Sequence, residues 1–401
     1  MMTPNDYSGL FSEDTHNFMA SPVREIFRRF PVPPRYSFAG GYPSKDTFPT
    51  QWLRDCNGRI LSRWGETCLQ YGGTQGVDAL RECLGKRYSV PTGNVQITTS
   101  SQQGIDICAR ILVNPGDIVL TQEPTYLGAI QSFKSYRARI VGVKSTALFR
   151  ERISQLRAEG GTVKFIYLIP DFCNPSSLTM TLEERHEIIE IARAAGIPIV
   201  EDSPYREVRF SGEQLPSIYS LAPDCTIHLG SFSKVFAPGL RLGWMFAPSD
   251  ILRQIYLCKQ ALDLCPPVLG QYMALDFLES GMLDVNLRST LTLYKRKRDR
   301  MLSALEKHMP EGVTWTHPDG GLFIFVTLPE EFNTVDFYET ALTNGVSYVS
   351  GSFFHTRKGE GLNTMRLNFS FCPEEDIEDG IALLSNLICK KLQQPHTSSR
   401  P

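Results

Sequence analysis

Short apolar runs alternate with amphipathic stretches along the first two thirds of the chain. Residues 163–169 form an almost continuous apolar run, which is typical of a strand buried on both faces of a sheet. Residues 181–195 repeat apolar positions with the period of a helix, and Thr181 followed by Glu184 predicts a capping box at its start. Further strands are expected at 95–99, 117–120, 197–201 and 226–229, and a further helix at 103–113. This alternation predicts a mainly parallel sheet with helices on both faces.

The pattern changes beyond residue 280. Residues 287–308 predict one long helix, whose basic run at 295–298 is interpreted as a face turned to solvent. Strands are expected at 321–327 and 365–371, and a last helix at 374–392. Together these elements predict a smaller α+β domain.

The expected organisation therefore has four parts. An N-terminal arm covers residues 1–35, where Ser21 and Pro22 form a helix-start signal. A large domain follows over 36–285, then a small C-terminal domain over 286–392, and a disordered tail over 393–401.

Composition places the chain among globular enzymes. With 401 residues, 42% hydrophobic and 21% charged, it can bury a sizeable core, which excludes global disorder. The net charge of −2 argues against nucleic acid as a partner, and no apolar run is long enough to span a membrane. The start of the chain lacks the apolar core of a secretion signal, so a cytoplasmic protein is expected.

Ten cysteines occur, none of them in a C-x-x-C pair. That spacing gives no support to a zinc site or a thioredoxin-like motif, so no metal is expected. In a chain of this length, reduced thiols of a cytoplasmic protein are the better interpretation.

The strongest candidate for chemistry is the segment 231–244, SFSKVFAPGLRLGW. Lys234 follows an apolar strand and lies between two serines and a glycine-containing turn that ends in Arg241. Serine hydroxyls and an arginine can hold a dianion, and a lysine beside it can form a Schiff base with a phosphate-bearing aldehyde.

Four other segments fit such a ligand, although each alone is better explained as turn or cap chemistry. Ser101 and Gln102 open a helix after a strand, and a helix N-terminus binds phosphate. Asp202 ends a buried strand, where a carboxylate can keep a pyridine nitrogen protonated. Asn174 can donate to a phenolate oxygen, and Tyr126 can stack on a flat ring.

In this order and spacing, the segments resemble fold-type-I pyridoxal-phosphate enzymes of aminotransferase class I, and among them the kynurenine/2-aminoadipate aminotransferases. The resemblance runs from about Ser21 to about residue 390. The motif S-F-S-K-x-x-x-P-G-L-R-x-G at 231–243 is highly specific, whereas Asn174-Pro175 and Asp202-x-x-Tyr205 are moderately so. The resemblance implies an α/β fold with a mainly parallel seven-stranded sheet in the large domain, and pyridoxal 5′-phosphate as the cofactor.

The resemblance also implies catalytic roles for Lys234, Asp202 and Tyr126. Lys234 forms the aldimine and moves the proton at the substrate Cα, Asp202 pairs with the pyridinium nitrogen, and Tyr126 stacks on the ring. The other implied cofactor contacts are Asn174 and Tyr205 at the phenolic oxygen, Ser101, Gln102, Ser231, Ser233 and Arg241 at the phosphate, and Tyr71 at the phosphate of the neighbouring subunit's cofactor.

For the substrate, Arg366 corresponds to the arginine that binds the α-carboxylate; its alternative interpretation is a surface arginine at a strand edge. The resemblance also implies a substrate contact for Asn174, and Gly41 and Tyr42 belong to a segment that resembles the family's substrate-binding glycine loop. Arg24 in the N-terminal arm can accept a distal carboxylate, whereas the surrounding aromatic residues Phe18, Phe27, Tyr36, Phe38 and Tyr42 suit an aromatic side chain.

Two positions depart from the family pattern. Asn174-Pro175-Ser176-Ser177 replaces the usual N-P-T-G, so the lost glycine is expected to stiffen or redirect that loop. Tyr42 stands where an aliphatic residue is more usual, which changes one wall of the substrate pocket.

The predicted function is transfer of an amino group between an α-amino acid, aromatic or acidic in its side chain, and a 2-oxo acid. A β-lyase, a decarboxylase or an oxidase on the same scaffold stays open, because the cofactor residues do not fix the reaction type. An aminotransferase-like domain of a transcription regulator is disfavoured, since only about forty weakly basic residues precede Gly40. A homodimer with shared active sites is expected, with a role in amino-acid metabolism or a biosynthetic pathway.

Overall fold

The larger sheet has seven strands in the order β2-β8-β7-β6-β5-β3-β4. β8 runs antiparallel to both of its neighbours, and all the other adjacent pairs are parallel. The expected mainly parallel seven-stranded sheet is therefore confirmed in this computed structural model, which describes residues 7–18, 20, 25 and 34–393. Its strands are β2 (Val95–Thr98), β3 (Ile118–Gln122), β4 (Arg139–Val143), β5 (Val163–Leu168), β6 (Ile199–Asp202), β7 (Thr226–Ser231) and β8 (Gly243–Phe246).

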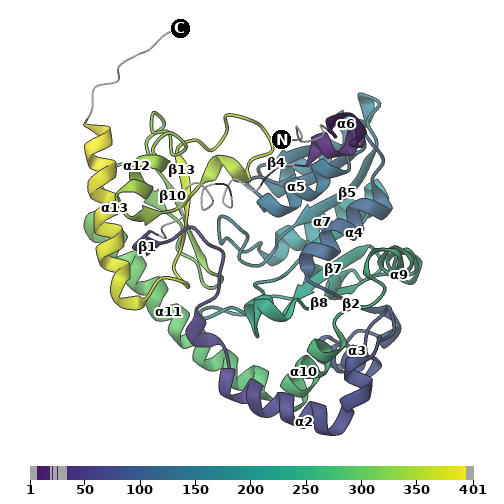
Figure 1. Cartoon of the computed structure of the whole chain (residues 1–401). Helices are drawn as coiled ribbons and strands as arrows, with labels where there is room; N and C mark the ends of the chain where they lie inside the picture. Colours follow the sequence, from purple (N-terminus) through teal and green to yellow (C-terminus); the bar gives the residue numbers. More distant parts are fainter. Residues whose placement is uncertain (1–6, 19, 21–24, 26–33, 394–401) are drawn as a thin grey trace, which may run out of the picture.

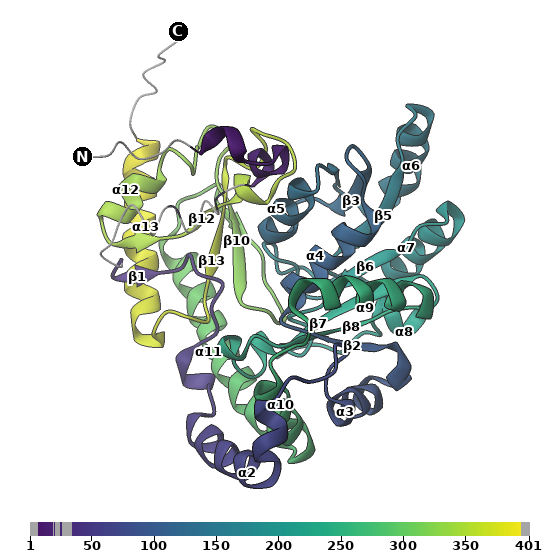
Figure 2. The same ribbon diagram turned by 45° about the vertical axis from the view of Figure 1, so that its right-hand side comes forward.

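Helices cover both faces of this sheet (Figures 1 and 2). Alternate residues of β5 show why: Phe165 and Tyr167 pack into the apolar cluster of one face, and Ile166 and Leu168 into that of the other. The first face carries α4 (Ser101–Leu112), α5 (Leu127–Ser135) and α9 (Ser249–Asp263), and the second carries α6 (Phe149–Ala158), α7 (Leu182–Ala195) and α8 (Ile218–Leu221).

The capping box expected at the start of α7 is present. The Thr181 hydroxyl accepts from the backbone N–H of Glu184 at 3.2 Å, and the Glu184 carboxylate accepts from the N–H of Thr181 at 2.8 Å. The observed helix begins and ends within one residue of the expected range, because both of its end signals are local.

The C-terminal part is built on a second sheet, with four antiparallel strands in the order β12-β13-β10-β9. The expected strands at 321–327 and 365–371 correspond to β10 and β13, and the last helix to α13. Its elements are α11 (Met282–His308), β9 (Thr314–Trp315), β10 (Phe323–Thr327), α12 (Tyr338–Thr343), β11 (Val346–Ser347), β12 (Val349–Ser350), β13 (Thr364–Asn368) and α13 (Ile377–Leu392).

Two further groups of elements join these parts. β1 (Tyr36–Ser37) pairs in parallel with β11, so this segment lies in the C-terminal part although it precedes the strands of the larger sheet in the sequence. Figure 1 shows the remaining long helices grouped beneath that sheet, with α11 running from this group to the second sheet. These helices are α2 (Thr50–Leu69), α3 (Asp78–Tyr88) and α10 (Val268–Glu279).

The basic run on α11 is only half exposed, so its interpretation as a solvated face is wrong for Lys297 and Arg298. Both side chains are buried, and the Lys297 ammonium donates to the backbone oxygens of Ser370 and Cys372, each at 2.9 Å. Lys295 and Arg296 do face solvent. Four consecutive helical residues occupy all sides of the helix, so two of them point inward, where carbonyl oxygens satisfy their charges.

Part of the expected organisation lies outside the described residues. This holds for Ser21, Pro22, Arg24 and most of the arm over 1–35, and for 394–401 of the tail. Among the described residues, no helix is both long and apolar enough to cross a membrane.

Candidate active site

The loops that follow β3, β5, β6 and β7 meet the start of α4 around one cavity of about 150 Å³. Parallel strands end at the same edge of a sheet, which is why segments far apart in the sequence converge here. The structure thus brings together ten of the predicted residues, Ser101, Gln102, Tyr126, Asn174, Asp202, Tyr205, Ser231, Ser233, Lys234 and Arg241. Ser100, Ile169 and Pro204 also line the cavity and were not predicted.

Lys234 ends a short 3-10 turn (Phe232–Lys234) directly after β7. Its ammonium donates to the backbone oxygen of Gly41 at 2.8 Å, which joins the glycine loop to the cavity. Burial, helped by the charges of Arg366 and Arg241, lowers the pKa of Lys234 to about 8. A lysine with such a pKa is partly neutral near physiological pH and is therefore a competent nucleophile and base.

Asp202 is the last residue of β6 and is buried. Its Oδ2 accepts from the hydroxyl of Tyr167 at 2.7 Å, whereas its Oδ1, also buried, has no hydrogen-bond partner within the described part of the chain. Burial raises the pKa of Asp202 to about 7, even though Tyr167 and His228 both act to lower it. A buried carboxylate with one oxygen unpaired is suited to bind a cationic N–H group.

Other residues that line the cavity are suited to bind an anion. Ser101 is the first residue of α4, whose N-terminal N–H groups have no partners in the helix. Ser231 caps the turn before Lys234, where its hydroxyl accepts from the N–H of Ser233 at 3.2 Å. Arg241 has a φ of +51° and lines the same cavity. Its guanidinium adds a positive charge beside these groups.

Arg366 on β13 is buried, so its alternative interpretation as a surface arginine is wrong. Its guanidinium donates to Oδ1 of Asn174 at 2.8 Å and to the backbone oxygen of Ala39 at 2.7 Å, and lies 4.1 Å above the ring of Phe323. Burial lowers the pKa of Arg366 to about 10. Asn174 is thereby held between this arginine and the cavity floor.

A wider hollow of about 970 Å³ adjoins the cavity, shares Lys234 and Arg241 with it, and is also lined by Arg366. Its wall includes Gly41, Tyr42 and Phe354, and the Tyr42 side chain is 55% exposed. Tyr42 packs edge-on against Phe371 at 5.6 Å, so the unusual aromatic residue forms part of this wall. Aromatic and polar side chains, Arg366 among them, form much of the lining of the hollow.

The loop with the altered motif keeps the conformation that a glycine favours. Ser177 adopts φ of +54°, in the left-handed region, and its hydroxyl is buried without a partner in the described chain. Forcing a residue with a side chain into this region costs about 1–2 kcal/mol. The serine therefore adopts the backbone conformation expected of the lost glycine.

One predicted residue, Tyr71, does not line the cavity or the wider hollow. Tyr71 is 78% exposed and borders a different hollow with Trp64 and Val268. Arg24 lies outside the described residues, so its placement stays a prediction.

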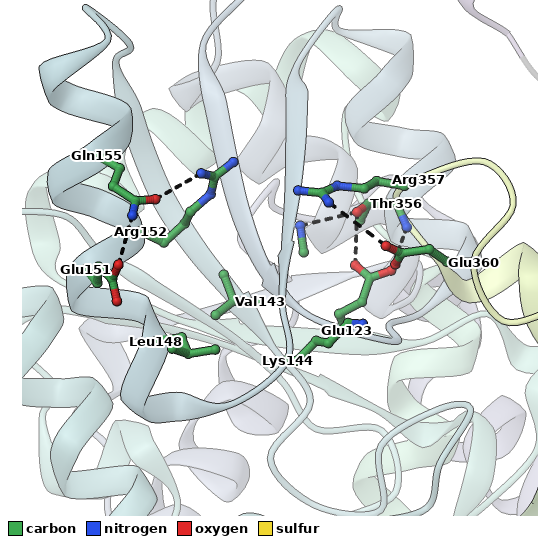
Figure 3. A pocket seen from close by; sticks show the side chains of 11 residues that line it. Glu123, Val143, Lys144, Leu148, Glu151, Arg152, Gln155, Thr356, Arg357 and Glu360 are labelled. Carbon is green, nitrogen blue, oxygen red and sulfur yellow. Dashed lines mark hydrogen bonds and ion pairs between the residues drawn. The ribbon is translucent and has the colours of Figure 1, made fainter.

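A second, charged hollow of about 280 Å³ lies between α6 and the loop that follows Phe354 (Figure 3). The Glu123 carboxylate accepts from the N–H and the hydroxyl of Thr356, at 2.8 and 2.9 Å, and pairs with His355 at 2.9 Å. Nδ1 of His355 also lies 3.5 Å from Glu360, so the possible metal ligands Glu123, His355 and Glu360 are close to one another. These contacts fasten the loop to the end of β3, and the absence of a metal stays a prediction.

Comparison with known proteins decides the family. The sequence pattern described as aminotransferase class I and II matches residues 46–384. The chain belongs to this family. It is 39% identical over 402 residues to the aromatic-amino-acid aminotransferase 1 of Thermococcus litoralis, covering 97% of this chain and 96% of that protein. It is 33% identical over 396 residues to the 2-aminoadipate transaminase of Thermus thermophilus, covering 96% and 98%.

A solved structure gives the same answer. The kynurenine aminotransferase of Pyrococcus horikoshii superimposes with a TM-score of 0.92 at 39% identity, covering 97% of this chain and 99% of that one. The resemblance read from the motifs is therefore confirmed, and with it the fold class. As a member of the class I and II family, the protein is an aminotransferase, and its cofactor is pyridoxal 5′-phosphate.

The residues of the cavity fit this cofactor. The unpaired Oδ1 of Asp202 offers an acceptor for a pyridinium N–H, and the start of α4 offers donors for a phosphate. Lys234 lies in the same cavity, where its side chain offers an amine. Besides the lining residues Ser100, Ile169 and Pro204, sequence reasoning missed Tyr167, whose hydroxyl donates to Asp202. The only signal of Tyr167 is a hydroxyl-bearing residue within a buried apolar strand, which resembles ordinary core.

Proposed function

We propose that this aminotransferase acts on α-amino acids with an aromatic or acidic side chain, and that the residues gathered around Lys234 divide the work as the motifs predicted. When bound, pyridoxal phosphate supplies an aldehyde that takes up amino groups and a ring that accepts electrons. The single observation that carries the proposal is the convergence of Lys234, Asp202 and Arg366 on adjoining hollows.

Lys234 binds the cofactor and moves the proton at the substrate Cα. Its lowered pKa supports both roles, because the amine must be neutral to attack and to accept a proton. The hydrogen bond to the Gly41 oxygen gives the free amine a fixed partner beside the cavity. Asp202 holds a proton at the ring nitrogen, which maintains the electron-accepting character of the ring.

Arg366 binds the substrate α-carboxylate, with Asn174 fixing the guanidinium from one side. The planar guanidinium suits a bidentate pair with a carboxylate, and its burial strengthens that pair. Ser101, Gln102, Ser231, Ser233 and Arg241 hold the phosphate, Tyr126 covers the ring, and Tyr205 reaches the phenolic oxygen.

The side-chain preference rests on the wider hollow and on relatives. Tyr42 and Phe354 provide apolar ring surface, as an aromatic substrate requires. The relatives named above are an aromatic-amino-acid, a 2-aminoadipate and a kynurenine aminotransferase, which supports the same range.

A panel of amino donors tests the substrate class. Phenylalanine, kynurenine, 2-aminoadipate, glutamate and alanine are each added to the holoenzyme, and the absorbance change from the pyridoxal to the pyridoxamine form is followed. The aromatic and acidic donors should react fastest, with Lys234→Ala as the inactive control. Equal or faster reaction of alanine would contradict the preference but not the transfer itself.

We expect Arg24 to favour acidic amino donors and to have no effect on aromatic ones. Loss of its charge in Arg24→Gln should raise KM for 2-aminoadipate and glutamate by roughly 10-fold or more, the usual value of one charge-assisted pair, and leave phenylalanine unchanged. An equal effect on both substrate groups would remove Arg24 from the substrate site.

We also propose a homodimer in which Tyr71 completes the partner's phosphate site. Its exposure and its distance from the cavity of its own chain support this role. Sedimentation of the holoenzyme should show a dimer, and Tyr71→Phe should weaken cofactor retention by about 1–3 kcal/mol. A fully active species of 45.1 kDa at nanomolar concentration would contradict the shared site.

Cytoplasmic location and a role in amino-acid metabolism complete the proposal. All ten cysteines lie in the described chain and are free thiols, which supports a reducing compartment. We retain the domain limits 36–285 and 286–392 as part of the proposal. The seven-stranded sheet lies within the first range, and the four-stranded sheet lies within the second.

A further inference from the structure

Tyr167 lies next to the cofactor cavity, and the proposed roles do not include it. It lies on β5, where it pairs in register with Val200 of β6, and Asp202 follows two residues later on the same face of the sheet. The two side chains therefore meet diagonally across neighbouring strands, on the face covered by α4.

The hydroxyl of Tyr167 is held in one direction. Its side chain is fully buried, and its ring packs edge-on against Phe133 at 5.4 Å. From this position the hydroxyl donates to Oδ2 of Asp202 at 2.7 Å. A fixed donor on one oxygen also fixes the plane of the carboxylate, and thereby the direction of the other oxygen.

We propose that Tyr167 is a positioning residue for the cofactor: its hydroxyl holds Oδ2 of Asp202 so that Oδ1 accepts the ring N–H and the shared proton stays on the ring nitrogen. The inference rests on pyridoxal phosphate being the cofactor. Between Asp202 and a pyridine ring there is one proton, which lies either on the carboxyl group or on the nitrogen. A hydrogen bond to the ionised carboxylate favours the second arrangement.

The other groups around Asp202 cannot replace this donor. His228 on β7 acts on Asp202 only through its charge and gives its Nδ1 to Glu201 on the opposite face of the sheet. Cys108 on α4 and Cys173 after β5 are buried thiols whose pKa values are raised by burial, so they are neutral. Tyr205 lines the cavity with Asp202, and burial likewise raises the pKa of its phenol.

The test reads the proton directly. The holoenzyme is prepared with pyridoxal phosphate labelled with ¹⁵N in the ring, and the nitrogen chemical shift is measured at neutral pH. The wild type should show a protonated ring, and Tyr167→Phe a shift toward the neutral pyridine, because the proton moves to Asp202. A hydrogen bond to a charged group favours its ionised form by roughly 10-fold or more, so most of the signal should move.

A matched control separates this role from simple packing. Tyr348→Phe removes another buried tyrosine hydroxyl, one that donates to the backbone oxygen of Thr334 in the C-terminal part. It should change thermal stability without moving the nitrogen signal. If Tyr167→Phe also left the signal of a protonated ring, the positioning role would be overturned.

A second pair of variants covers the case in which Tyr167→Phe does not fold. Tyr167→Gln retains a donor, and Tyr167→Met has similar size without one. The nitrogen should stay protonated to a greater extent in the Gln variant, and identical signals in the two would overturn the inference. A wild-type protein that fails to bind the labelled cofactor would instead overturn the cofactor assignment, and the inference with it.

Discussion

The two faces of the larger sheet treat neighbouring carboxylates in opposite ways. Glu201 points toward α8, where it accepts from two backbone N–H groups at 3.0 and 2.8 Å and from Nδ1 of His228 at 3.1 Å. Asp202 points toward α4, where Tyr167 serves one oxygen and the other has no partner among the described residues. Both carboxylates are buried.

Their pKa values separate accordingly. Burial would raise the pKa of Glu201, but His228 and the N–H groups outweigh it and hold that pKa below its usual range. For Asp202, burial outweighs its few partners and raises the pKa to about 7. A fully bonded buried carboxylate contributes to stability, whereas an incompletely bonded one is ready to bind a cationic ligand.

The largest expected effect follows removal of the unpaired charge. Asp202→Asn should keep the fold but lower kcat by about 10²–10⁴-fold, because a neutral amide does not hold the proton on the ring nitrogen. Stopped-flow measurement of the first half-reaction checks this. Activity close to that of the wild type would mean that another group protonates the ring.

On the opposite face, the same chemical change should act on stability. Glu201→Gln replaces a buried carboxylate that accepts three hydrogen bonds by a neutral amide, and losing a hydrogen bond to a charged group costs about 1.5–3 kcal/mol. Urea unfolding measures the loss, and turnover per folded molecule should stay near the wild-type value. A variant of normal stability and reduced kcat would reverse the contrast between the two faces.

Acidity provides a third test, on the cofactor-free protein. Between about pH 4 and 7 the folded state holds a proton on Asp202 that the unfolded state has released, so stability falls as pH rises through this window. By pH 8 the wild type should be less stable than Asp202→Asn by on the order of 4 kcal/mol. Glu201 acts in the opposite direction, because its contribution is present above its ordinary pKa and is lost on acidification. Urea titrations at pH 5, 6, 7 and 8 compare the two, and parallel pH profiles would contradict the separation.

The smallest effect concerns the helix that serves Glu201. The Ser217 hydroxyl caps α8 by accepting from the N–H of Ser220 at 3.0 Å. Ser217→Ala should cost about 0.5–2 kcal/mol of stability, measured by thermal unfolding, and leave catalysis unchanged. Loss of activity in this variant would show that the two faces are coupled.

Most of the sheet could be predicted, since the apolar runs of β5, β6 and β7 are long and their helices carry local end signals. The cavity residues could be predicted because their motifs follow strand ends. The burial of Lys297 could not, since its acceptors are backbone oxygens some seventy residues away in the chain. Tyr167 was missed for the same reason: its partner lies on another strand, and within β5 it resembles core.

The hydrogen bonds between residues 123–125 and residues 354–356, here called the seam, have a mechanical consequence. The N–H of Thr125 donates to the oxygen of Phe354 at 2.8 Å, next to the bonds between Glu123 and Thr356. Tyr126 lies one residue beyond the seam on one side, and Phe354 reaches back under Arg366 on the other, at 5.1 Å. The seam therefore connects the segment that carries Tyr126 to the segment that carries Phe354. We expect any opening of the enzyme to pivot about these contacts, because they hold the two segments together.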